Sequence, residues 1–450
     1  MLKWLVRLHL ASPALWLRQS LFWAGAVLVG LAATLLARGA DLAQLGFHAL
    51  MRLAGAHGLG LWPVFVLTPL GLIASVLLTR RVFPGAQGSG IPQVIAAVRL
   101  RDPATMRRVL SLRIAIGKIL LTLLGLACGA SIGREGPTVQ VGAALMFAMG
   151  LALRRPRREL QRALVLAGGA AGVAAAFNTP LAGIVFAIEE LSRSFEQRTS
   201  GTTLTAVIVA GITTLALSGN YTYFGVTSAE LALGPAWLGV LLCGVAGGLA
   251  GGLFGRLLLT AADGLPGPAG RLVMHHPALF AALCGVALAA IDVASGGLTA
   301  GTGYAEARHL VEGGNAMPLL FPLYKLAATV ISYISGIPGG IFAPSLAIGA
   351  GLGAVLSPLV AHTPSAAVVL LGMVGYFAGA VQAPITAAVI VMEMTDNQAM
   401  TVPLLATSLL AYGVSRLICP RPLYGALAER FLGVAKWSGG NAPSSALAER

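Results

Sequence analysis

The longest uncharged stretch of this 450-residue chain, residues 326–392, holds 67 residues without one Asp, Glu, Lys or Arg. A soluble domain does not leave so long a stretch uncharged, because about a quarter of its residues are charged on average. The stretch is nevertheless broken by glycines and prolines, at Gly336, Pro338, Gly339, Gly340, Pro344, Pro358, Pro364 and Pro384. Straight membrane-spanning helices do not tolerate so many breaks, whereas short helices that pack against protein do.

The composition of the whole chain supports the same interpretation. Apolar residues make up 57% and charged residues only 10%, which excludes both a soluble fold and a disordered chain. The net charge of +14 comes largely from basic residues in short loops, as the positive-inside bias predicts, and does not indicate nucleic-acid binding. We therefore predict an all-α polytopic membrane protein with well over ten helices, many of them short, tilted or broken. The cysteines form no CxxC pair and the histidines no HExxH motif, so we expect no metal and no cofactor.

Two parts of the chain resemble each other. Residues 166–190 align with residues 370–394 at a shift of 204, and residues 133–143 align with residues 340–350 at a shift of 207. A weaker match pairs GSG at 88–90 with GTG at 301–303. Chance similarity among Ala- and Gly-rich helices is the alternative. Three blocks in the same order favour two homologous halves, an arrangement typical of transporters, with the substrate held where the halves meet.

The expected organisation follows from these halves and from the apolar runs. We expect an interfacial helix over 1–18, transmembrane repeats over 19–218 and 231–418, a C-terminal helix over 419–434 and a mobile tail over 435–450. The N-terminal segment carries basic residues around apolar ones and has no convincing cleavage site for a signal peptide.

The first motif with chemical meaning is GSGIP at residues 88–92. Its two glycines leave backbone N–H groups uncovered, Ser89 adds a hydroxyl donor, and Pro92 suits the first turn of a following helix. Helix N-termini with free N–H groups bind anions. Such a site has donors without a full positive charge, so a bound ion can also leave. The alternative is a glycine-rich turn that serves only helix packing.

The second motif is GREGP at residues 133–137, in which Arg134 and Glu135 interrupt apolar sequence on both sides. A charge at the centre of a bilayer costs at least about 2.5–3.5 kcal/mol, so such residues usually face a cavity or have a function. Glu135 lies at a predicted helix start, where its carboxylate can occupy an anion site when ionised and vacate it when protonated. The alternative is a helix cap with an Arg–Glu pair at the membrane surface.

Further candidate residues lie in the second half and near the helix ends. GGIFAP at residues 339–344 aligns with the second motif and also predicts a helix start that faces an anion, with packing alone as the alternative. Glu189 and Glu190 end a long apolar run, where one of them can accept a proton unless the helix simply ends at the interface. Lys118 is a candidate buried counter-charge. Tyr424 could donate its hydroxyl to an anion, although an interfacial tyrosine is the simpler interpretation.

These motifs together resemble the signature segments of the CLC family of chloride channels and chloride/proton antiporters. GSGIP, GREGP and GGIFAP occur in the family's order, and the segments at 177–190, 389–397 and 422–424 also resemble family segments. The resemblance covers about residues 20–430. It implies a homodimer of subunits, each with two inverted repeats and its own anion pathway.

The resemblance also implies roles for individual residues. It places Glu135 as the gating glutamate, Glu190 as the inner proton glutamate and Lys118 near the inner proton route, and we expect Arg134 and Glu189 to support them. It implies that Ser89, Ile341, Phe342 and Tyr424 surround chloride, and we expect the neighbouring Gly90, Ile91 and Gly340 at the helix starts to bind it as well. Ser89 favours chloride, because nitrate-selective relatives tend to have proline there. Gln93 and Ile95 depart from the family pattern, since relatives often carry acids there that could pair with Lys118.

The resulting hypothesis is a chloride/proton antiporter in a bacterial inner membrane, of the prokaryotic type without nucleotide-binding CBS domains. The partners we expect are chloride, protons, the lipid bilayer and a second copy of the chain. A passive voltage- or pH-gated chloride channel of the same fold is the alternative within transport, and Glu190 favours the antiporter. An intramembrane enzyme would need catalytic motifs such as HExxH or GxSxG, which the sequence lacks.

Overall fold

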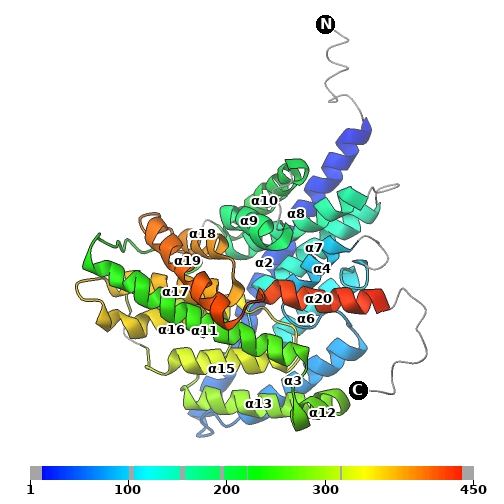
Figure 1. Cartoon of the computed structure of the whole chain (residues 1–450). Coiled ribbons are helices and arrows are strands. Elements are labelled where there is room, and N and C mark those ends of the chain that lie inside the picture. The colour runs from blue at the N-terminus through cyan, green and yellow to red at the C-terminus, as the bar shows by residue number, and fades with distance from the viewer. Residues whose placement is uncertain are drawn as a thin grey trace.

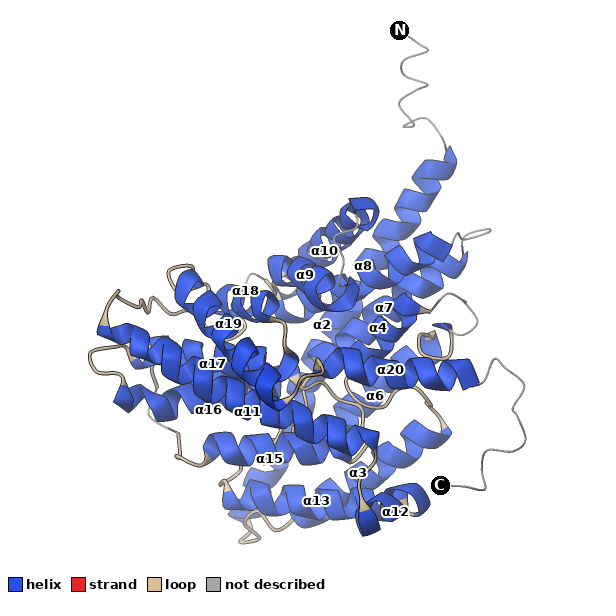
Figure 2. Ribbon diagram, viewed as in Figure 1, coloured by secondary structure: helices blue, strands red, loops and turns tan. Residues whose placement is uncertain are grey.

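The computed structural model describes residues 13–100, 106–152, 158–192, 197–219, 221–314 and 317–437. Within these ranges the chain forms 18 α-helices, and the only extended pairings are two isolated bridges between loops (Figure 2). Eight helical segments are long and apolar enough to span a membrane. The described part of the chain is therefore an all-α, multi-pass membrane protein, as the sequence predicts.

The helices fall into two series of the same order. The first is α2 (Pro13–Ala56), α3 (Val64–Arg81), α4 (Ile91–Arg99), α6 (Leu112–Ala127), α7 (Glu135–Ala152), α8 (Arg158–Phe177), α9 (Pro180–Phe186) with the π-helical turn η2 (Ala187–Ser192), and α10 (Gln197–Ser218). The second is α11 (Leu238–Asp263), α13 (Pro277–Ala294), α14 (Tyr304–Val311), α15 (Phe321–Ile334), α16 (Phe342–Leu356), α17 (Ser365–Val381), α18 (Pro384–Thr395) and α19 (Thr401–Ile418). The predicted repeat therefore extends over both halves.

The remaining elements lie outside this correspondence. They are the 3₁₀ turns η3 (Pro235–Trp237) and η4 (Ser357–Leu359), the short helix α12 (Gly267–His275) and the C-terminal helix α20 (Leu423–Trp437). Helix α10 ends at Ser218 and α19 at Ile418. Helix α2 begins at Pro13 and runs without a break through residue 18. Residues 1–12 and 438–450, which hold most of the expected N-terminal helix and C-terminal tail, lie outside the described residues.

Glycine pairs let the helices of each half approach backbone to backbone. A Cβ on Gly349 of α16 would lie 2.6 Å from the carbonyl oxygen of Gly372 on α17, and the counterpart residues Gly142 and Gly168 meet in the same way between α7 and α8. Hydrophobic transfer does not drive helices together inside lipid, so close van der Waals packing through small residues does. This packing explains much of the chain's high glycine content.

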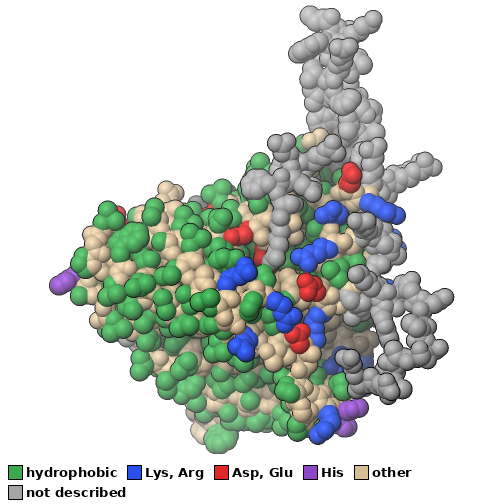
Figure 3. Space-filling model, viewed as in Figure 1, with side chains coloured by type: hydrophobic (Ala, Val, Ile, Leu, Met, Phe, Trp, Pro, Cys, Tyr) green, Lys and Arg blue, Asp and Glu red, His purple; other side chains and the backbone are tan. Residues whose placement is uncertain are grey.

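The outer surface is the surface of a membrane protein. Large apolar side chains point outward along α2, α3, α10, α11, α13 and α19. In the view of Figure 3, hydrophobic side chains cover most of the face, and the charged side chains gather over one part of it. The C-terminal helix α20 crosses this face and packs on α4 (Figure 1). This contact brings the start of α20 to the region where the two halves meet.

Candidate functional site

Three loops meet where the two halves contact each other. Gly133 and Gly340, which are equivalent in the two repeats, exchange backbone hydrogen bonds, each with an N–O distance of 2.7 Å. Gly88 donates to the carbonyl of Ile337 at 3.2 Å and accepts from the amide of Gly339 at 3.1 Å. A pair of equivalent residues that bond each other is what a local two-fold axis between inverted repeats requires. The motifs GSGIP, GREGP and GGIFAP therefore surround one centre.

Helices start from each of these loops. α4 begins at Ile91, α7 at Glu135 and α16 at Phe342, and the N-cap residues Gly90 and Ile341 make no side-chain capping bond of their own. The starts of α4 and α16 therefore direct N–H donors and the positive ends of two helix dipoles towards the centre. The expectation that the motifs begin helices is thus met by the geometry.

Glycine is required where the first two loops touch. Gly90 has a φ of 104°, in the left-handed region, and a Cβ there would lie 2.8 Å from the carbonyl oxygen of Gly136. A Cβ on Gly136 would lie 2.7 Å from the carbonyl oxygen of Ser89. Because contacts this short do not occur, any other residue at either position would push the two helix starts apart.

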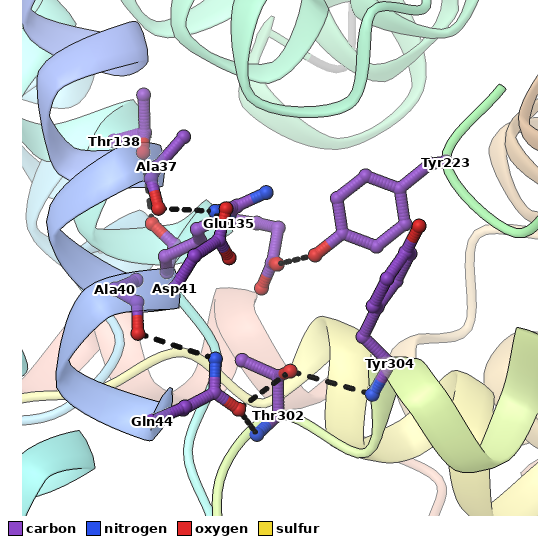
Figure 4. Close-up of polar contacts among 10 residues, drawn as sticks. Ala37, Ala40, Asp41, Gln44, Glu135, Thr138, Tyr223, Thr302 and Tyr304 are labelled. Atoms are coloured by element: carbon purple, nitrogen blue, oxygen red, sulfur yellow. Dashed lines mark hydrogen bonds and ion pairs between the residues drawn. The ribbon is translucent and has the colours of Figure 1, made fainter. Parts of the chain in front are cut away.

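Glu135 lies inside this centre and is fully buried. Its Oε1 accepts a hydrogen bond from the Tyr223 hydroxyl at 3.1 Å, and its Oε2 lies 3.5 Å from the backbone amide of Ala343, in the first turn of α16. The carboxylate therefore occupies a position at a helix N-terminus where an anion is stabilised. Figure 4 shows Glu135 and Tyr223 facing each other between α2 and the start of α14.

Arg134 binds α2. Its Nη1 donates to the carbonyl of Ala37 at 2.6 Å and to Oδ1 of Asp41 at 3.0 Å. The Asp41 side chain is 61% exposed, so this ion pair contributes little net stability. The alternative of an Arg134–Glu135 surface pair is not the arrangement in the structure, because Glu135 is buried and Arg134 has another partner.

Two buried hydroxyls converge on the same centre from α4 and α20. Tyr424 stands at the start of α20, and its hydroxyl lies within interaction range of the Ser89 hydroxyl. Neither oxygen makes a hydrogen bond of acceptable geometry within the described protein. Leaving a buried hydroxyl unpaired costs about 1–3 kcal/mol, so the arrangement fits a bound acceptor between the two donors.

Phe342 forms the apolar wall beside these hydroxyls. Its ring centroid lies 4.8 Å from that of Phe377, 5.8 Å from those of Phe186 and Tyr424, and 6.1 Å from that of Phe177. The predicted residues Ser89, Glu135, Phe342 and Tyr424 are thus brought together.

Lys118 is fully buried and pairs with no carboxylate in the described part of the chain. Its Nζ donates to the carbonyl of Gly88 at 2.8 Å and to that of Gln87 at 3.4 Å, where the GSGIP loop begins. Gln93, which stands where relatives often have an acid, donates to the carbonyls of Gly85 and Gln87. In this chain Lys118 therefore holds the loop by its backbone.

Lys325 was missed by the sequence analysis and repeats this arrangement in the second half. It is fully buried, and its Nζ donates to the carbonyls of Thr299 at 2.8 Å and Gly301 at 2.9 Å. The shift of 207 that aligns the second motif with the third also places Lys118 on Lys325, so the signal was present in the sequence.

The adjacent residues Glu189 and Glu190 have separate environments. Glu189 is half-buried and accepts two backbone hydrogen bonds from the first turn of α18, from Ile385 at 3.1 Å and Thr386 at 2.6 Å. Its repeat counterpart Glu393 accepts from Leu181 at 3.1 Å and Ala182 at 2.6 Å, at the start of α9. Each half therefore caps a helix of the other half.

Glu190 is the buried member of the pair, with 1% of its surface exposed. The structure thus separates one glutamate that holds a helix start from one that is buried within the protein.

A cavity of about 1040 Å³ leads from the surface to Ser89. Tyr333 and Gly88 line it together with four arginines: Arg107, Arg108, Arg113 and Arg430. Among the described residues that line it, the charged ones are all arginines, and their positive charge attracts anions.

Known proteins resemble this chain over most of its length. Residues 70–416 match the family model described as voltage gated chloride channel. The H(+)/Cl(-) exchange transporter ClcA of Yersinia pestis bv. Antiqua (strain Angola) is 33% identical over 430 residues, which cover 90% of this chain and 86% of the relative. ClcA of Salmonella typhi is 33% identical over 393 residues, covering 84% and 80%.

Solved structures share the fold. A slow cyanobacterial Cl-/H+ antiporter superposes with a TM-score of 0.78 at 28% identity, covering 92% of this chain and 98% of the other. A CLC-type fluoride/proton antiporter superposes with a TM-score of 0.76 at 24% identity, covering 91% and 98%, a likeness that concerns the fold alone.

Proposed function

Since the chain belongs to the voltage-gated chloride channel family, known as CLC, we propose that it exchanges chloride for protons by secondary active transport. The observation that carries this proposal is the buried carboxylate of Glu135 at the first turn of α16, 3.5 Å from the amide of Ala343. Relatives named H(+)/Cl(-) exchange transporters, and a structural neighbour titled a Cl-/H+ antiporter, support chloride and protons as the transported ions.

The proposed chloride pathway enters through the arginine-lined cavity and ends at the centre between the halves. Chloride is held by N–H groups at the helix starts and by the two buried hydroxyls, with these groups supplied by Ser89, Gly90, Ile91, Gly340, Ile341, Phe342 and Tyr424. These donors stabilise an anion without a full positive charge, so that the ion is bound and then released.

The proposed proton step uses the competition between Glu135 and chloride. The ionised carboxylate occupies the start of α16 and excludes chloride. A proton taken up at the carboxylate removes the charge, weakens its attraction to the helix dipole and leaves the site to the ion. Glu190 passes protons to and from the opposite solution. Each time the carboxylate and chloride replace one another at the site, one proton moves in the direction opposite to chloride.

The supporting residues act through position. Arg134 anchors the GREGP loop to α2, Lys118 holds the GSGIP loop, and Glu189 fixes the start of α18. No enzymatic step is part of this proposal.

We further propose that two copies associate in a bacterial inner membrane, each with its own pathway. The support is membership of the family together with apolar side chains on equivalent helices of both halves, such as Leu181 on α9 and Ile385 on α18. Chemical cross-linking of the purified protein in lipid tests this assembly. A cross-linked dimer is expected, and a monomer at all cross-linker concentrations would contradict it.

The test of function is proton movement in liposomes that contain the purified protein and a chloride gradient. Uphill proton movement is expected for the wild type. Glu135→Gln should keep chloride flux and abolish proton movement, because the amide cannot be ionised. Glu429→Gln, on the exposed face of α20, serves as the matched control and should behave like the wild type. Chloride flux without proton movement in the wild type would instead indicate a passive channel.

A further inference from the structure

The segment that joins the two repeats, residues 221–230 and here called the linker, reaches into the ion site. Tyr223 from the linker is buried with 2% of its surface exposed, and its hydroxyl donates to Oε1 of Glu135 at 3.1 Å. No residue of either repeat contributes an equivalent contact to Glu135 through a side-chain hydroxyl in the described structure. We propose that Tyr223 is a positioning residue that holds the Glu135 carboxylate in the anion site and so limits the access of chloride.

The linker is attached to both halves, and these attachments fix the position of Tyr223. On the first half, the side-chain amide of Asn178 donates to the carbonyl of Tyr221 at 3.0 Å. On the second half, the amide of Phe224 donates to the carbonyl of Met394 at 3.0 Å. Tyr223 therefore lies between two anchor points that belong to different repeats.

A second anchor follows within a few residues. The side chain of Asn397 donates to the carbonyls of Thr227 at 3.0 Å and Ala229 at 2.8 Å, so the linker cannot swing outward as a free loop. Backbone that is hydrogen-bonded at several points loses little further entropy when its side chain binds a partner.

The packing around the Tyr223 ring fixes the orientation of its hydroxyl. Its centroid lies 4.9 Å from that of Tyr304, 5.0 Å from that of Phe224 and 5.6 Å from that of Phe177, all edge-on. The guanidinium of Arg134 lies 5.5 Å from the ring centroid. The ring is thus held on several sides, and the hydroxyl points at Glu135 (Figure 4).

The chemistry of the contact favours the ionised carboxylate in its present place. A phenol donates a strong hydrogen bond to a carboxylate and a weaker one to a neutral group. Loss of a hydrogen bond to a charged group typically shifts an equilibrium by about tenfold or more. Because the carboxylate and chloride compete for one site, weaker holding of the carboxylate should let chloride bind at lower concentration.

This inference rests on the proposed function, and the chloride dependence of flux tests it separately from proton coupling. In liposomes, Tyr223→Phe should lower the chloride concentration for half-maximal flux by about tenfold, since the phenyl ring keeps the packing and removes only the hydroxyl. Tyr304→Phe is the matched control. It removes a hydroxyl from the neighbouring ring, whose only side-chain partner among the described residues is Arg308, and should leave the chloride dependence unchanged.

A double variant distinguishes positioning of Glu135 from a general structural role. In a Glu135→Ala background no carboxylate competes, so adding Tyr223→Phe should leave the chloride dependence unchanged. An equal effect of Tyr223→Phe in both backgrounds, or none in the wild-type background, would overturn the proposal. A wild type without proton movement would overturn only the proposed exchange, because the competition for chloride can still be measured.

Discussion

The reciprocal caps of α9 and α18 give a stability prediction that depends on the inverted repeat. Glu189 and Glu393 each accept one backbone hydrogen bond at 2.6 Å and one at 3.1 Å, at the start of a helix in the other half. Substitution by Gln removes the charge and leaves one acceptor oxygen where there were two. The side-chain NH₂ group of the glutamine then faces a backbone N–H and cannot accept a hydrogen bond from it.

The size of the effect follows from these contacts. One hydrogen bond to a charged group contributes about 1.5–3 kcal/mol, and the helix dipole adds about 0.3–1 kcal/mol. Both carboxylates are half-buried, so the lower end applies, and each substitution should destabilise the fold by about 2 kcal/mol. Since the two geometries match, Glu189→Gln and Glu393→Gln should have equal effects.

The assay is thermal unfolding of the purified protein in detergent, followed by the loss of helical signal. Unfolding entropy of about 2.1 cal/mol/K per residue means that 2 kcal/mol lowers the melting temperature of a chain this long by about 2 °C. Glu429→Gln, an exposed carboxylate on α20, is the control and should not change it. If Glu189→Gln and Glu393→Gln lower the melting temperature by clearly different amounts, the reasoning from symmetry is refuted. If neither lowers it more than the control does, the predicted contribution of the caps to stability is refuted.

Two further predictions concern ion selectivity and coupling. Glu190→Gln should stop proton movement while chloride flux continues in the liposome assay, because the amide cannot carry a proton. Proton pumping by that variant would identify another inner acceptor. Ser89→Pro should shift the preference from chloride towards nitrate, because it removes one of the two buried hydroxyls at the centre. Equal nitrate-to-chloride flux ratios in variant and wild type would mean that Ser89 does not set selectivity.

Much of the fold could be predicted because identical residues at equivalent positions of the two halves reveal the repeat. The alignments of Gly133 with Gly340 and of Glu189 with Glu393 are visible in the sequence, and both pairs lie at contacts between the halves. Proline and glycine mark the helix starts because of their own backbone restrictions. The motifs therefore predicted where α4, α7 and α16 begin.

The sequence could not show what those equivalent residues contact. The alignment pairs Glu189 with Glu393, but only the crossing of the halves places each carboxylate on a helix of the other half. Tyr223 was missed for a different reason. It lies outside both repeats, so no alignment between the halves draws attention to it, and its approach to Glu135 depends on hydrogen bonds to Asn178 and Met394.

The linker also has a consequence for the symmetry of the molecule. Two separate half-length chains related by a two-fold axis would present the same structure to both ends of an ion pathway. Joining them needs one connector, and one connector cannot obey the two-fold axis. In this chain the connector is drawn into the interior at the Glu135 end, where Tyr223 is buried. The covalent joining of the halves thus makes the two ends of the pathway different, in addition to the difference between Glu135 and its counterpart Phe342.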